Sequence, residues 1–224
     1  MLHRLRFAVK PLVPVGLHGF AKALAMRAAA LALRGDNVEC PCCGRRFRRF
    51  LEYPTLFCPG CSSYERHRFL CLYVERHPGL LRGRRSALHV APEPCLKPLL
   101  DGAGIDDYLS IDLDYRLAME RMDVTSLRLP DDHFDLVVCS HVLIEVPDHE
   151  RGIAELRRVL RPGGIGLFQT AVTAQRVPPV LRDELVAAGF VVETVSAAEL
   201  GPELVARHGL IADEELYVAT KSAG

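Results

Sequence analysis

The chain has 224 residues, of which 49% are hydrophobic, enough for one main domain with a buried core and a small additional module. It contains no run of about 18 uncharged apolar residues, which excludes a membrane-spanning helix. The formal net charge is zero, but residues 1–85 carry 16 Lys and Arg against 5 Asp and Glu, whereas residues 86–224 carry 12 against 23. This split predicts two units with different roles.

The basic front half has two interpretations, and the sequence leaves both open. It could bind nucleic acid, an anionic membrane or an acidic substrate. It could equally dock on the acidic half of the same chain, which would neutralise both.

Residues 1–37 form a basic N-terminal segment. Pro11 and Pro14 interrupt its start, and apolar residues then recur at helical spacing between Leu17 and Leu31, which predicts a helix that ends at Gly35. We expect this helix to pack on the protein, with contact of residues 1–34 to a membrane surface as the alternative. A targeting peptide is a further alternative, which the interrupted apolar stretch disfavours. The absence of a secretory signal and the scattered cysteines lead us to expect a cytoplasmic protein.

Two Cys-x-x-Cys pairs, separated by fourteen residues, carry the most specific motif of the chain. Turns at Pro41, Gly44 and Pro59 would point all four thiolates at one centre, and Zn²⁺ is the usual occupant of such a site. Two disulfides or free thiols are the alternative, which four further scattered cysteines and the absence of a secretory signal disfavour. Four thiolates leave no open position, so the zinc would be structural. The predicted ligands are Cys40, Cys43, Cys58 and Cys61, with Cys42 as a spare thiol.

Residues 38–85 comprise this zinc ribbon and a following helix, which Ser62 and Glu65 would open as a capping box and Pro78-Gly79 would end. From residue 86 to residue 224, strands and helices alternate. The pattern predicts an α/β fold with a Rossmann-like, mostly parallel sheet and helices on both faces. The predicted strands are 87–90, 108–111, 134–139, 165–169, 190–195 and 215–220, and the predicted helices are 96–100, 150–160 and 179–188.

Side chains at the predicted strand ends indicate the cofactor. Pro92 and Pro94 lack N–H groups and Glu93 would repel phosphate, which disfavours dinucleotides and ATP. Asp112, at the end of the second strand, can accept hydrogen bonds from two ribose hydroxyls, and Asp123 from an adenine amino group. Each acid alone could be a solvated strand end or a helix cap. Together they fit S-adenosylmethionine, a cationic sulfonium with ribose and adenine and no phosphate.

The stretch from Leu127 through Phe134-Asp-Leu-Val-Val-Cys-Ser-His141 to Leu143, followed by Glu155-Leu-Arg-Arg-Val-Leu-Arg-Pro-Gly-Gly164, resembles the signature of class I S-adenosylmethionine-dependent methyltransferases of type 11. The cysteine pairs, Glu65-Arg-His-Arg68 and Leu88 to Pro94 resemble one bacterial subgroup with an N-terminal zinc ribbon. The resemblance covers most of residues 35–220.

By position, the resemblance implies that the loop at 91–93 flanks the methionyl end of the cofactor, that Asp112 holds the ribose and Asp123 the adenine. Ser140 and His141 would line the transfer site. His141 is the best candidate for a general base, with Glu145 next; His141 could instead pack beneath the cofactor, and Glu145 could be a solvated acid. The implied cofactor-binding residues are Ala91, Pro92, Glu93, Asp112, Leu113, Asp123, Val124, Ser140 and His141.

Three features depart from the family pattern: the Gly-x-Gly-x-Gly loop is absent, Ile144-Glu145 stands where relatives have Glu-His, and the segment 170–181 is short. We expect a methyltransferase acting on a small molecule or glycan. The first alternative is an RNA methyltransferase whose ribbon grips phosphates through Arg45, Arg46, Arg48, Arg49, Arg66 and Arg68. The second is a non-catalytic or repurposed S-adenosylmethionine-binding protein.

Overall fold

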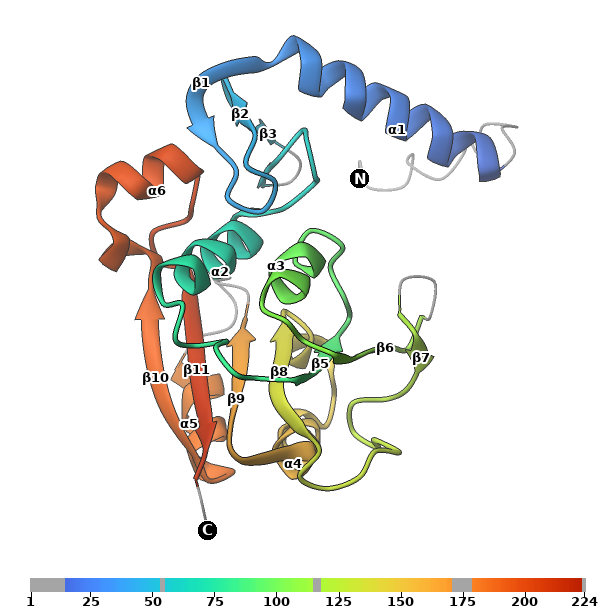
Figure 1. Cartoon of the computed structure of the whole chain (residues 1–224), viewed down its shortest axis with the longest axis vertical. Coiled ribbons are helices and arrows are strands. Elements are labelled where there is room, and N and C mark those ends of the chain that lie inside the picture. The colour runs from blue at the N-terminus through green and yellow to red at the C-terminus, as the bar shows by residue number, and fades with distance from the viewer. Residues whose placement is uncertain (1–14, 53–54, 115–117, 171–178, 223–224) are drawn as a thin grey trace, which may run out of the picture.

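A small cysteine-containing ribbon lies at one end of a seven-stranded sheet, and helix α2 lies between the two (Figure 1). The computed structural model describes residues 15–52, 55–114, 118–170 and 179–222. Within these residues, no helix is long and apolar enough to cross a membrane.

The sheet has the strand order β10-β11-β9-β8-β5-β6-β7. The five strands from β5 to β9 pair in parallel with their neighbours, whereas β11 is antiparallel to both β9 and β10. The mostly parallel sheet is therefore confirmed, and the strand order reverses between β5 and β8, where ligands bind in such sheets. The bounds are Ser86–Val90 for β5, Asp107–Asp112 for β6, Glu120–Arg121 for β7, Phe134–Ser140 for β8, Leu160–Gln169 for β9, Phe190–Ser196 for β10 and Glu215–Lys221 for β11.

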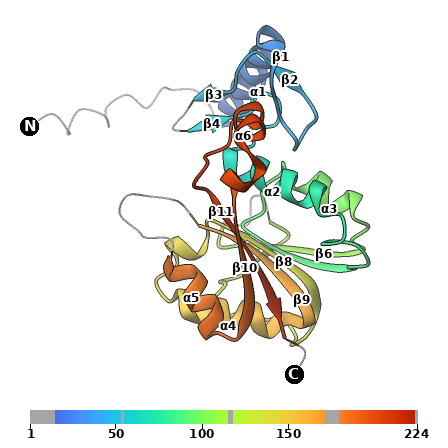
Figure 2. The same cartoon turned by 90° about the vertical axis from the view of Figure 1, so that its left-hand side faces the viewer.

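Helices cover both faces of this sheet, as predicted (Figure 2). Buried side chains of α2 (Glu65–Arg76) and α3 (Lys97–Gly102) belong to one apolar cluster, and those of α4 (His149–Val159) and α5 (Pro179–Ala187) to another. All five residues of β5 are buried, and the successive side chains of Ala87 and Leu88 enter opposite clusters. Burial on both faces explains why this strand has apolar residues on both of its sides rather than an alternating pattern.

The ribbon follows α1 (Val15–Ala32) and consists of two short antiparallel pairs. The predicted end of the first helix was wrong by three residues: Gly35 lies inside β1, where a Cβ atom would stand 2.4 Å from Cγ of Arg48. Glycine is therefore needed here for close packing. The four strands are β1 (Arg34–Glu39), β2 (Arg46–Phe47), β3 (Leu51–Glu52) and β4 (Leu56–Phe57).

The start of α2 also differs from its prediction. Ser62 is not the N-cap; it adopts a left-handed conformation with φ of 62° and donates its N–H to the carbonyl of Cys58, as part of the second cysteine turn. Tyr64 is the N-cap, and its N–H donates to Nδ1 of His67 at 3.2 Å. A histidine thus performs the reciprocal capping expected of Glu65.

Arg68 of α2 joins the ribbon to the C-terminal part of the chain. Its guanidinium is fully buried, lies 4.1 Å from the ring centroid of Phe50, and donates to the carbonyls of Ser63, His208 and Gly209 at 2.7 Å each. His208 ends helix α6 (Pro202–His208), which the sequence did not predict. A buried charge satisfied by carbonyls from both parts holds them in one arrangement.

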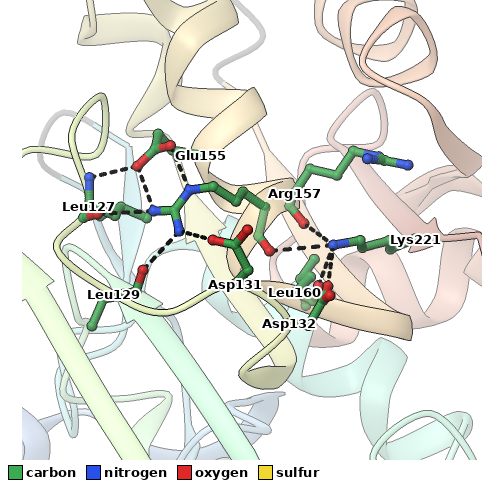
Figure 3. Close-up of polar contacts among 9 residues, drawn as sticks. Leu127, Leu129, Asp131, Asp132, Glu155, Arg157, Leu160 and Lys221 are labelled. Carbon is green, nitrogen blue, oxygen red and sulfur yellow. Dashed lines mark hydrogen bonds and ion pairs between the residues drawn. The ribbon is translucent and has the colours of Figure 1, made fainter.

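At the opposite end of the sheet, two further cations, Arg158 and Lys221, stabilise the fold (Figure 3). Arg158 of α4 pairs with Glu155 and Asp131 and donates to the carbonyls of Leu127 and Leu129, which fixes the loop that leads into β8. Lys221, at the end of β11, pairs with Asp132 and donates to the carbonyl of Leu160 at 2.7 Å. Much of the methyltransferase-like signature in this stretch therefore builds the fold, far from the strand ends that carry the site.

Candidate functional site

The four predicted zinc ligands lie together. Their Sγ atoms are all within 4.8 Å of one another, with 3.6 Å between Cys40 and Cys61 and 3.8 Å between Cys43 and Cys58. Four thiolates at about 2.3 Å from a tetrahedral Zn²⁺ are separated by roughly 3.8 Å, so these cysteines fit the ion. The N–H of Gly60 donates to Sγ of Cys58 at 3.2 Å, an outer contact typical of such centres.

Cys42 is not a member of this group. Contacts with the thiols of Cys40, Cys71 and Cys95, together with burial, raise the pKa of Cys42. All eight cysteines are free thiols in the structure. The spare thiol of the sequence is thus a separate feature from the metal site.

The predicted cofactor residues gather at the carboxyl ends of β5, β6 and β7, which are neighbouring strands. Ala91, in a left-handed conformation with φ of 49°, donates its N–H to the carbonyl of Ile111 at 2.8 Å, which places the loop after β5 beside the end of β6. Asp112 pairs in register with Arg121 of β7, two residues before Asp123. Leu113 is 61% exposed, and Val124 is buried.

Both aspartates are ordered by the turns that follow them. Oδ1 of Asp112 accepts the N–H of Asp114 at 3.0 Å, and Oδ1 of Asp123 accepts the N–H and hydroxyl of Thr125 at 2.9 and 2.8 Å. The Thr125 contacts hold the pKa of the exposed Asp123 below its ordinary value. Each carboxyl group keeps a second oxygen that can act as an acceptor at the strand ends.

Glu93 is mostly buried and its two oxygens face different histidines. Oε1 lies 3.2 Å from Nε2 of His67, on α2, and Oε2 lies 2.9 Å from Nε2 of His89, on β5. Burial raises the pKa of Glu93, but the two histidines outweigh it and lower the pKa to about 2. Glu93 is ionised as the sequence suggested, and the carboxylate is anchored rather than open.

Ser140 and His141 lie at the end of β8, across the switch point from Ala91. The hydroxyl of Ser140 donates to Oε1 of Gln169 at 3.2 Å, and Nε2 of Gln169 donates to the carbonyl of Arg66 on α2 at 3.1 Å. His141 adopts a left-handed conformation with φ of 58°. Non-glycine residues in this region cluster at functional sites, and both such strand-end residues, Ala91 and His141, were singled out from the sequence.

The second candidate base, Glu145, is exposed in a short helical turn at Leu143–Glu145, whereas His141 has a partner that sequence reasoning missed. Oε1 of Glu214, a carboxylate with 3% residue exposure, lies 3.3 Å from Nε2 of His141. Sequence reasoning assigned no role to Glu214, His67 or Gln169. The signals were weak: Glu214 directly precedes the last strand, Gln169 ends the predicted strand 165–169, and His67 lies within the motif Glu65 to Arg68.

The arrangement supplies a histidine held by a buried acid, two turn-fixed carboxylates and, in the ribbon, a cluster of four cysteines that could hold a metal ion. Such a site suits group transfer from a cofactor bound across the strand ends, with proton removal by histidine.

Comparison with known proteins identifies the fold of the sheet. Residues 106–168, which run from β6 to β9, match the family model described as a methyltransferase domain. The chain therefore carries a methyltransferase domain, and its mostly parallel sheet has the fold of S-adenosylmethionine-dependent methyltransferases.

Solved structures share the methyltransferase fold at low sequence identity. An S-adenosylmethionine-dependent methyltransferase from Mesorhizobium loti is 18% identical with a TM-score of 0.52, over 68% of this chain and 97% of that chain. The [4+2]-cyclase SpnF is 19% identical with a TM-score of 0.52, over 92% and 95% of the two chains. Phosphoethanolamine N-methyltransferase 2 of Haemonchus contortus, in complex with S-adenosyl-L-methionine, is 13% identical with a TM-score of 0.51, over 68% and 52%. No curated protein matches the sequence.

Proposed function

We propose that this methyltransferase transfers a methyl group to a small-molecule or glycan acceptor whose accepting atom gives up a proton. The observation that carries the proposal is the pairing of His141 with the buried Glu214 at the carboxyl end of β8. A carboxylate on one ring nitrogen fixes the orientation of the imidazole and stabilises its protonated form, which favours the role of general base.

The cofactor-binding roles extend the same proposal. Asp112 would accept the two ribose hydroxyls and Asp123 the adenine amino group, since both lie at the ends of neighbouring strands. The exposed Leu113 and the buried Val124 would cover the adenine ring, and the loop Ala91 to Glu93 would flank the methionyl end.

In the proposed mechanism, S-adenosylmethionine supplies the methyl group as a sulfonium electrophile. The strand-end residues hold the acceptor and the donor in line, which is the main demand of this substitution. His141 takes the proton of the acceptor, and Glu214 stabilises the imidazolium that results. Ser140, fixed by Gln169, would position the acceptor.

Burial of the ribbon aromatics disfavours RNA as the acceptor. Phe47 and Phe50 are 1% and 4% exposed, so neither offers a face on which a base could stack. One observation keeps RNA as the second candidate: a groove of about 570 Å³ between α1 and the ribbon is lined by Arg27, Arg34, Arg45 and Arg46. Guanidinium groups in this number could bind phosphates.

The zinc site, the cellular compartment, the membrane contact and the short 170–181 segment remain proposals. A structural zinc at the four cysteines fits their spacing, and free thiols agree with a reducing compartment such as the cytoplasm. A repurposed activity is the third candidate, because a cyclase shares the fold. Contact of residues 1–34 with a membrane surface rests partly on residues 1–14, and the short 170–181 segment on residues 171–178, which lie outside the described residues.

The test is transfer of a labelled methyl group by the purified protein into fractionated cell extract. We expect label in a small-molecule or glycan fraction, with His141→Ala as the matched inactive variant. Label confined to RNA would favour the second candidate, and it should then disappear when Arg45 and Arg46 become Gln. S-adenosylmethionine binding without label in any fraction would favour the repurposed protein.

A further inference from the structure

Glu93 is held between two histidines that come from different parts of the chain. His89 belongs to β5, immediately before the cofactor loop, and its Nδ1 is fixed by the hydroxyl of Tyr108 at 3.1 Å. His67 belongs to α2, the helix that follows the zinc ribbon, and is 3% exposed. The carboxylate of the cofactor loop therefore depends on a residue outside the methyltransferase sheet.

The loop has few other means of holding its position. Pro92 and Pro94 have no N–H groups to donate. Two backbone hydrogen bonds hold residues 91–95: the N–H of Ala91 donates to the carbonyl of Ile111, and the N–H of Leu96 donates to the carbonyl of Glu93. The side chain of Glu93 supplies the remaining contacts. Losing one of them should leave the carboxylate and the loop less ordered.

His67 uses its two ring nitrogens for two separate purposes. Nδ1 accepts the N–H of Tyr64 and lies 3.3 Å from Sγ of Cys95, which fixes the start of α2. Nε2 lies 3.2 Å from Oε1 of Glu93, an ion-pair distance without hydrogen-bond geometry. Burial lowers the pKa of His67, but Cys95 and Glu93 outweigh it and raise the pKa above its ordinary value. The two purposes can be separated experimentally, because an Asn amide can replace Nδ1 and a Gln amide can replace Nε2.

A second contact of the same helix strengthens this connection. The carbonyl of Arg66 accepts from Gln169, which also holds Ser140 at the end of β8. The first turn of α2 begins four residues after the predicted ligand Cys61. The first turn of α2 therefore contacts Glu93, after β5, on one side of the switch point and Gln169, at the end of β9, on the other.

We propose that His67 is a positioning residue for the cofactor site: it sets the Glu93 carboxylate and the loop 91–95, and so makes S-adenosylmethionine affinity depend on the zinc-ribbon helix. This inference rests on the proposed binding of S-adenosylmethionine at these loops. It assigns the ribbon a role in preparing the cofactor site.

The experiment compares wild type with His67→Asn and His67→Gln by calorimetry with S-adenosylmethionine. His67→Asn keeps an acceptor for Tyr64 but cannot reach Glu93, so we expect affinity to fall about tenfold or more with the melting temperature nearly kept. His67→Gln places an N–H near Glu93 and should bind within about threefold of wild type. His77→Gln, at the other end of α2, is the matched control and should bind as wild type.

A second readout needs no cofactor and applies even if a variant is unstable or wild type binds no S-adenosylmethionine. Amide hydrogen exchange in residues 91–96 should be faster in His67→Asn, and in Glu93→Gln, than in wild type, with strands β8 and β9 unchanged. Equal S-adenosylmethionine affinity of His67→Asn and wild type, or equal exchange in the loop, would overturn the role of His67. Absence of binding by wild type would instead remove the proposed cofactor site, while the exchange data would still decide whether His67 holds the loop.

Discussion

His141 and Glu214 are 73 residues apart in the chain and 3.3 Å apart in the fold. The resemblance to methyltransferases marked His141 from the sequence, because it places this residue beside the transfer site and imidazole is the usual base near neutral pH. Its partner could not be found in the same way, since an acid before a final strand has no distinctive local pattern. Single residues of this site were therefore predictable where chemistry follows a motif, and unpredictable where it follows from packing.

The pair makes a prediction at this scale. Glu214→Gln should lower kcat for methyl transfer by about 10- to 100-fold with little change in KM for S-adenosylmethionine, because the base loses the partner that orients it. Initial rates on the accepting fraction measure this. Asp213→Asn alters the exposed neighbouring acid and should leave the rate unchanged; equal loss in both variants would speak against a specific role of Glu214.

Glu93 gives a pH prediction. Its folded pKa of about 2 lies below the ordinary value of 4.5, so its contribution to stability is present above about pH 4.5 and is lost as pH falls toward 2. His67 has a raised pKa, so its contribution to stability is present below about pH 6.5 and is lost as pH rises through the folded pKa. The groups facing Glu93 are His67 and His89, with Cys95 and Tyr108 behind them.

The difference in unfolding free energy between wild type and Glu93→Gln should therefore be largest between about pH 4.5 and 6.5, at roughly 3 kcal/mol, and smaller on both sides. Urea unfolding across this range measures it. A difference that does not change between about pH 3 and 6 would contradict the ionised Glu93.

At the scale of elements, α2 was predicted with the correct end but the wrong cap, and α6 was not predicted. Ser62 and Glu65 match a capping box locally, but Ser62 belongs to the cysteine turn instead, because its N–H donates to the carbonyl of Cys58. Helix α6 has only seven residues, and its place is set by Arg68 and by Arg207, which pairs with Asp36 and Glu39 of β1. The long periodic elements were predictable because their pattern is local, whereas short elements placed by distant partners were not.

Replacing Arg68 tests the connection between α2 and α6. Arg68→Met should lower the unfolding free energy by roughly 3 kcal/mol or more, because the buried carbonyls of Ser63, His208 and Gly209 lose their donors. Thermal or urea unfolding monitored by circular dichroism gives the value. Arg76→Met, at the exposed end of the same helix, should change stability by less than about 0.5 kcal/mol; a similar small effect in Arg68→Met would contradict the role assigned to it.

At the scale of the whole molecule, the charge split predicted two parts, and the structure shows how their contact is made. Docking of a basic ribbon on an acidic partner would pair ribbon arginines with acids of the second half. The ion pairs between β1 and α6 have the opposite sense: Asp36 and Glu39 belong to the basic half and Arg207 to the acidic half. Net charge could not predict this contact, which depends on a few side chains.

The ribbon makes a prediction about metal. Metal analysis of the purified protein should give about one zinc per chain, and Cys58→Ser should lose it and unfold the ribbon, because a three-thiolate site binds zinc more weakly. Cys42→Ser should retain the metal, since the cluster of four cysteines is complete without Cys42. Zinc retained in full by Cys58→Ser would show that these four cysteines are not the site.

The central claim is that the strand ends of the sheet bind S-adenosylmethionine, and calorimetry on the purified, zinc-loaded protein tests it most directly. Wild type should bind about one S-adenosylmethionine and neither NAD nor ATP. Asp112→Ala should lose about 1.5–3 kcal/mol of binding free energy, because the ribose loses a charged acceptor. Asp106→Asn changes an exposed acid at the amino end of β6, away from the carboxyl ends of the strands, and should bind as wild type. Absence of binding by wild type, or equal affinity of Asp112→Ala and wild type, would contradict the account.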